Sequence, residues 1–277
     1  MGLTIHYSLN ARCSDARARE LVRALHQHAQ DLPFQELGPV VEMSGKECDY
    51  NTPRRKGDPL TWLLIQARET VEIRTKGSTP KSSYITYRDV HPSRVIAFTA
   101  WPGEGCEESN FGLCEYPAEV KTGEGMWRTG IVGWGWGSFC KTAYSANSNY
   151  GGVPHFLRCH LTVIALLDKA KELHCLGKVH DEGGFWEKRD MQALARMVAD
   201  SNAMLAAFGG LLKDLAGEGI EMPISEFPDF EKLEALGQDK LPPPLAQLAK
   251  LAQQVTPRTC ISTSLPLDTS FKPTIRT

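Results

Sequence analysis

Residues 154–173, PHFLRCHLTVIALLDKAKEL, form the most strongly patterned stretch of the chain. Apolar side chains fall on nearly every face of the helix that this stretch predicts, so we expect the helix to be central and buried. Pro154 suits the first helical turn, and Lys169 and Lys171 suit the negative end of the helix dipole. The other elements are therefore expected to pack around this helix.

The chain before this helix mostly alternates apolar and polar side chains, which predicts β-strands. Residues 3–9 predict a first strand, and residues 16–32 predict an amphipathic helix that Pro33 ends. Six further strands are predicted over residues 34–41, 62–73, 83–90, 94–101, 126–132 and 138–145, with a hairpin turn at 76–81. Residues 102–125 contain many glycine, glutamate and cysteine residues, so we expect a long loop there.

A second helix is predicted over residues 186–215, where apolar side chains follow helical spacing. This order indicates an α+β fold, in which helices cover a mainly antiparallel sheet and form a C-terminal pair. A ferredoxin-like core is one specific form of that fold. Eight of the 17 prolines follow residue 216. We therefore expect one globular domain over residues 1–216 and a Pro-rich, partly disordered tail over 217–277, with a short helix at 244–254.

The composition argues against several classes of protein. The formal net charge is −2, whereas a general nucleic-acid-binding protein normally carries a basic excess. No apolar run approaches the ~20 residues that a membrane-spanning helix needs, and no signal-peptide pattern is visible. The eight cysteines lack CxxC pairs, so we expect reduced, mostly buried thiols and a cytoplasmic location.

Residues 101–190 concentrate the side chains that functional sites use. They hold five of the six tryptophans, five of the eight cysteines, four of the eight histidines and 14 of the 24 glycines. Ordering glycine and accommodating tryptophan both cost free energy. Their occurrence together with ionisable and sulfur-containing side chains therefore predicts a shaped, polar-lined surface. We expect a site for a small molecule or a peptide there.

Cys140 is the candidate nucleophile of this region. A catalytic thiol needs a lowered pKa and a base within hydrogen-bond reach. His180 is the candidate base, and Asp181, Glu182 or Glu187 would orient its ring. This set predicts a thiol-dependent hydrolase or transferase. The alternative is that Cys140 is a small apolar residue buried in a strand, as free cysteines usually are.

Trp134 and Trp136 lie in the segment Gly-Trp-Gly-Trp-Gly, residues 133–137. In an extended chain both indoles point to one side, where they would stack on a sugar, a base or a cation. The alternative is that both indoles belong to the core. The predicted ligand-binding set is completed by Lys141, Tyr144 and Trp186.

His155, Cys159 and His160 are the candidate metal ligands. His155 and Cys159 are four residues apart and share a helix face. Zinc is held by three or four such ligands in tetrahedral array, so a zinc-dependent hydrolase is a further alternative. The spacing matches no standard zinc pattern, and core packing or helix-end contacts explain the same residues. The sequence predicts no other cofactor.

These patterns leave two main classes of function open. In the first, the protein is an enzyme that uses Cys140 and His180. In the second, it is a non-catalytic ligand-binding or protein-interaction module, whose tail contacts a protein partner. An accessible Cys140 beside a histidine favours the enzyme, whereas a buried Cys140 with Trp134 and Trp136 exposed favours binding.

Overall fold

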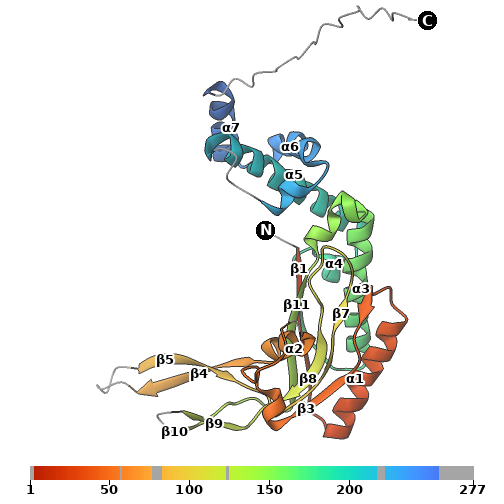
Figure 1. The fold of residues 1–277 in the computed structure, drawn as a ribbon, viewed down its shortest axis with the longest axis vertical. Coiled ribbons are helices and arrows are strands. Elements are labelled where there is room, and N and C mark those ends of the chain that lie inside the picture. Colours follow the sequence, from red (N-terminus) through yellow and green to blue (C-terminus); the bar gives the residue numbers. More distant parts are fainter. Residues whose placement is uncertain (1–2, 57, 77–82, 123–124, 217–221, 256–277) are drawn as a thin grey trace, which may run out of the picture.

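The computed structural model describes residues 3–56, 58–76, 83–122, 125–216 and 222–255 of the 277-residue chain. A six-stranded antiparallel sheet forms its centre, in the order β12-β1-β11-β8-β6-β3 (Figure 1). These strands are β12 (Leu176–Asp181), β1 (Thr4–Ala11), β11 (Trp134–Lys141), β8 (Phe111–Glu115), β6 (Arg94–Phe98) and β3 (Val41–Ser44). Helices cover this sheet, so the predicted α+β class is confirmed. The ferredoxin-like core stays a prediction.

Helices lie on both faces of the sheet. α1 (Asp15–Gln30) and α3 (Gly152–Glu172) pack on one face, and α2 (Pro59–Gln66) packs on the other (Figure 1). The stretch that predicted a central helix forms α3, in which nine side chains are buried. α1 begins after Ser14, whose hydroxyl accepts a hydrogen bond from the Arg17 N–H at 3.4 Å.

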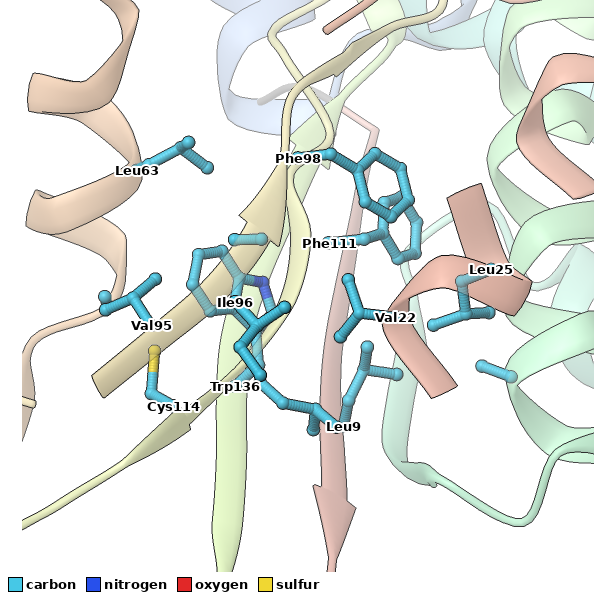
Figure 2. Close-up of a cluster of buried hydrophobic side chains, with 14 of the residues drawn as sticks. Leu9, Val22, Leu25, Leu63, Val95, Ile96, Phe98, Phe111, Cys114 and Trp136 are labelled. Carbon is cyan, nitrogen blue, oxygen red and sulfur yellow. The ribbon is translucent and has the colours of Figure 1, made fainter. Parts of the chain in front are cut away.

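Figure 2 shows how the two helix layers meet the sheet. Val22 and Leu25 of α1 lie beside the aromatic rings of Phe98 and Phe111. These two rings come from paired positions of β6 and β8, and their centroids are 5.9 Å apart. Leu63 of α2 approaches from the other side of the sheet. The sheet is therefore buried on both faces where α1 and α2 cover it.

Smaller elements surround the sheet. Two hairpins, β4 (Glu69–Lys76) with β5 (Ser83–Val90) and β9 (Glu119–Thr122) with β10 (Gly125–Arg128), project from the same end of the molecule (Figure 1). A third small pair joins β2 (Glu36–Leu37) to β7 (Ala100–Trp101). Short 3₁₀ helices cover Gly45–Cys48, Ala143–Ala146, Ser148–Tyr150, Pro223–Glu226 and Gln238–Lys240.

The C-terminal helices form an arm that extends beyond the sheet. After the short α4 (Phe185–Lys188), α5 (Met191–Ala216) runs away from the body, and α6 (Phe230–Gly237) and α7 (Pro243–Val255) lie against it (Figure 1). None of the described helices is long and apolar enough to cross a bilayer. Two small clusters of buried side chains hold the arm together: Ala206, Ile224 and Phe227 in one, and Ala207, Leu211, Leu241 and Ala249 in the other.

Within the predicted tail, the short helix at 244–254 is present as α7, while α6 was not expected. Both helices contact α5, so this part of the tail is folded. Residues 217–221 and 256–277, which were also expected to be disordered, lie outside the described chain. The division into a domain and a tail stays a prediction.

Other expectations about local structure were wrong. The expected loop over 102–125 contains β8, whose consecutive buried side chains are typical of a strand covered on both faces. The expected strand over 62–73 begins as α2, because the Asp58 side chain caps the Leu60 N–H at 3.0 Å and Pro59 occupies the first turn. The edge strand β12 was not expected at all.

Two glycines of the sheet differ in the free space beside them. A Cβ at Gly112 would lie 2.5 Å from the Ala97 Cβ and 2.7 Å from the Ile96 carbonyl oxygen, whereas a Cβ at Gly137 meets no described atom within 4 Å. We expect Gly112→Thr to lower the free energy of unfolding by about 1–3 kcal/mol. Gly137→Thr should change it by less than about 1 kcal/mol. Urea denaturation compares the two variants, and equal losses would contradict the open surface over β11.

Candidate functional site

A cavity of about 430 Å³ opens between α2 and the last part of β11. Trp62 and Gln66 are four residues apart on α2, so they share one side of that helix. Phe139 of β11 lies opposite them. The cavity is lined by Trp62, Gln66, Glu107, Glu108, Asn110 and Phe139.

Aromatic side chains form the walls of this cavity and remain accessible. Trp62 is 61% exposed and Phe139 is 43% exposed. Large aromatic side chains usually bury most of their surface, so two accessible rings beside one cavity indicate a binding surface. Their π-faces attract cations as well as flat apolar groups.

Asn110 forms the floor of the cavity and is fully buried. Its carbonyl oxygen accepts hydrogen bonds from the Tyr7 hydroxyl at 2.8 Å and the Trp136 indole N–H at 2.9 Å. Its side-chain N–H donates to Gln66 Oε1 at 2.9 Å, and the same oxygen accepts from Ser138 at 3.1 Å. No described group donates to Asn110 Oδ1. This oxygen has almost no accessible surface, so it is enclosed beneath the cavity, where an acceptor without a donor is costly.

Glu107 and Glu108 place two exposed carboxylates at the rim. Their segment is fixed by backbone bonds, because the Glu107 N–H donates to the Lys141 carbonyl at 3.0 Å and the Ser109 N–H donates to the Ala100 carbonyl at 2.8 Å. Aromatic walls and two carboxylates together suit a cationic group.

The open face of the sheet continues the site beyond Phe139. His6 of β1 lies between Phe139 and His180, with ring centroids 6.0 Å and 6.1 Å away. Gly135 and Gly137 of β11 leave the neighbouring surface flat, because neither has a side chain. Phe139 therefore belongs both to the cavity and to this strip of rings.

Cys140 and His180 do not come together in this structure. Cys140 pairs with Ile5 of β1, and His180 pairs with the next residue, His6. Because successive residues of a strand point to opposite faces, the thiol and the imidazole lie on opposite faces of the sheet. Cys140 is fully buried, and burial, with Glu107 and Cys159 nearby, raises the pKa of its thiol.

Asp181 points inward and contacts His160 of α3. Its Oδ1 lies 3.3 Å from His160 Nε2, and both side chains are fully buried. Asp181 also accepts the N–H groups of Gly183 at 2.8 Å and Trp186 at 2.9 Å. Burial raises the pKa of Asp181, but the imidazole and these N–H groups outweigh burial and lower it overall. Thr142 completes the set, with its hydroxyl 3.0 Å from His160 Nδ1.

The indoles of Trp134 and Trp136 are in the core, at 3% and 1% exposed. The Trp134 ring faces the Arg94 guanidinium, whose carbon lies 5.8 Å from its centroid. The Trp136 N–H holds the backbone of Asn110, so Trp136 positions the cavity floor without facing the cavity. With Cys140 also buried, neither of the two accessibility patterns expected from the sequence is present in full.

The remaining predicted residues lie apart from the cavity. The Lys141 ammonium is 4.9 Å from the Tyr144 ring centroid, and the Arg189 guanidinium is 4.6 Å from the Trp186 ring centroid. Both are intramolecular cation–π contacts that occupy the aromatic face. Glu187 is exposed on α4.

The three candidate metal ligands are divided between two environments. His155 Nε2 lies 3.5 Å from Cys159 Sγ, but His160 turns to Asp181 and Thr142. Within the described ranges, no group of three or more histidine, cysteine or acidic side chains is arranged to hold a metal ion. Zinc binding stays a prediction.

The sequence predictions missed the residues that line the cavity. Trp62 was expected in a strand, and Glu107, Glu108 and Asn110 were expected in a loop with no assigned role. The Asp58-Pro59 pair was the one local signal, because it predicts a helix start and so places Trp62 and Gln66 on one face. No family, curated protein or solved structure matches this chain significantly.

Proposed function

We propose that the protein is a non-catalytic recognition module that binds a lysine or arginine side chain of a peptide in the cavity between Trp62 and Phe139. The observation that carries this proposal is the pair of accessible rings, Trp62 and Phe139, which line one cavity together with two exposed carboxylates.

The walls and rim support the same ligand chemistry. A cation between Trp62 and Phe139 gains cation–π attraction at both rings. Glu107 and Glu108 add two carboxylates of the complementary sign, which also steer a basic peptide to the site. A volume of about 430 Å³ falls within the usual range for small ligand sites and admits one long side chain.

The enzyme hypothesis receives less support from the same geometry. A thiol hydrolase needs an accessible thiolate beside its base, and Cys140 is buried on the face opposite His180. The cytoplasmic location remains part of our proposal, and the seven free cysteines of the described chain favour a reducing compartment.

Binding of short synthetic peptides tests this proposal. We expect a peptide with one lysine among glycines to bind more tightly than the same peptide with norleucine or glutamate, as measured by calorimetry or amide shift changes in NMR. A trimethyllysine peptide keeps the charge and the cation–π attraction, so we expect it to bind about as tightly as the lysine peptide. Norleucine binding as tight as that of lysine, or a preference for glutamate, would reject the proposal.

Matched variants locate the binding at this cavity. Glu107→Gln combined with Glu108→Gln should weaken lysine-peptide binding about fivefold, since exposed charge pairs contribute about 0.2–1 kcal/mol each. Trp62→Ala should weaken it about threefold, because a cation–π contact at an exposed site contributes about 0.5–1 kcal/mol. Glu119→Gln and Val132→Ala are the controls, since both residues are exposed and outside the cavity. Controls that weaken binding as much would place the peptide elsewhere.

A further inference from the structure

Three sulfur atoms gather under a tight turn at residues 103–106. The turn is closed by the Cys106 N–H, which donates to the Gly103 carbonyl at 3.0 Å. Gly105 occupies its third position with φ of 77°, a conformation that type II turns require and glycine adopts readily. A Cβ at Gly103 would lie 3.1 Å from Cys159 Sγ, so the turn rests directly on that sulfur.

Polar groups surround Cys159 near the start of α3. His155 Nε2 and an Arg158 guanidinium nitrogen each lie 3.5 Å from its sulfur, and its thiol donates to the Pro102 carbonyl at 3.4 Å. Cys106 closes the turn that rests on the Cys159 sulfur, so the two thiols are neighbours. The Cys106 thiol lowers the pKa of Cys159, and the Arg158 charge lowers it further, although burial opposes both; Cys159 and burial raise the pKa of Cys106.

Cys106 is the accessible member of this pair. Its side chain is partly exposed, whereas Cys159 and Cys140 are fully buried. The Cys140 thiol donates to the Glu107 carbonyl at 3.2 Å, whereas the Cys159 sulfur lies directly under the turn. Cys159 is therefore the expected partner of Cys106.

We propose that Cys106 and Cys159 form a reversible disulfide bond when a peroxide oxidises the protein. The bond joins the turn at residues 103–106 to α3 without requiring either element to approach the other from a distance. This proposal is independent of the proposed binding function.

The chemistry balances with hydrogen peroxide as the oxidant. The Cys159 thiol ionises, and its thiolate attacks one oxygen of a peroxide that enters beside the accessible Cys106; the hydroxide that leaves takes up the released proton as water. The Cys106 sulfur then attacks the sulfur of the Cys159 sulfenic acid, and its proton leaves with the displaced hydroxide as water. In total, two thiols give two electrons to one peroxide, and the products are one disulfide and two waters.

Mass spectrometry of the full-length protein tests the proposal. The reduced protein is treated with hydrogen peroxide, denatured, and alkylated at its remaining thiols. We expect a chain that has lost two hydrogen atoms, and a proteolytic fragment in which the peptides of Cys106 and Cys159 are joined until dithiothreitol separates them. Cys106→Ser and Cys159→Ser should each abolish the joined fragment, whereas Cys114→Ser, at a buried cysteine outside this cluster, should retain it.

Several results would overturn the proposal. A bond from Cys106 to Cys140, a bond between two chains, or oxidation that stops at sulfinic acid without a joined fragment would each do so. No reaction with peroxide would also reject it. Circular dichroism of each serine variant confirms that a lost disulfide does not reflect a lost fold.

Discussion

Asp181→Ala is expected to lower the free energy of unfolding by about 3–5 kcal/mol, because it leaves a buried partner without its counterpart. Asp181 and His160 are both fully buried, and the carboxylate also accepts two backbone N–H groups. Removing it therefore leaves these two N–H groups without their acceptor and the buried His160 ring without its neighbouring carboxylate. Chemical denaturation of the wild type and the variant measures the loss.

Two further variants separate this effect from a general loss of charge. Asp181→Asn keeps one oxygen that accepts a hydrogen bond, so it should lower the free energy of unfolding less than Asp181→Ala does. Asp168→Asn breaks the exposed pair with Arg189 and should cost less than about 1 kcal/mol. An alanine variant that is no less stable than Asp168→Asn would contradict the buried network.

The pH dependence of the Asp181 effect has a definite sign. The pKa of Asp181 is lowered in the folded protein, so its ionised form stabilises the fold. That contribution is fully present above the unfolded pKa of about 3.9 and is lost as the pH falls through the folded value. The stability difference between the wild type and Asp181→Asn should therefore shrink on acidification below about pH 4. A difference that grows on acidification would contradict the lowered pKa.

Trp136→Ala is expected to cost about 3–5 kcal/mol, the usual loss for a large aromatic side chain removed from a packed core. Trp136 is 1% exposed, and its N–H bond to the Asn110 carbonyl joins the core to the cavity floor. Trp136→Phe keeps most of the packing and loses that bond, so about 1 kcal/mol is expected. Trp62→Ala removes an exposed indole and serves as the control, with less than about 1 kcal/mol expected. If Trp62→Ala and Trp136→Ala lowered the free energy of unfolding by similar amounts, the exposed position of Trp62 and the core position of Trp136 would be contradicted.

Sequence patterns predicted the parts of the fold that carry a strong period. α1 and α3 have apolar faces with helical spacing, and β1, β5 and β6 alternate or bury β-branched residues, so all five were expected in place. β8 was missed because a central strand buries consecutive residues and loses its alternation. Glycine at 135 and 137 also suggested a loop, although the tryptophans between them follow the alternation of a strand.

Most of the candidate site could not be predicted from the sequence. Its residues come from α2, the segment before β8, and β11, and only the fold brings these together. The site residues predicted from the sequence were chemically reactive types, and several of them are buried in the folded protein. Asp181 and His160 contact each other in the core, and Trp136 donates to the backbone of Asn110. A residue type indicates what a side chain can do, but its burial decides whether it does so.

The middle of the sheet is joined differently from its edges. β8 and β11 share a ladder at only two positions, Trp134 with Glu115 and Gly135 with Cys114, before they part. Beyond that point the amide of Gln66 bridges the two strands through Asn110 and Ser138. A substitution at position 62, one turn away, therefore touches neither the ladder nor the bridge. Position 62 is therefore the place where the proposed ligand preference can be re-engineered while the scaffold keeps its stability.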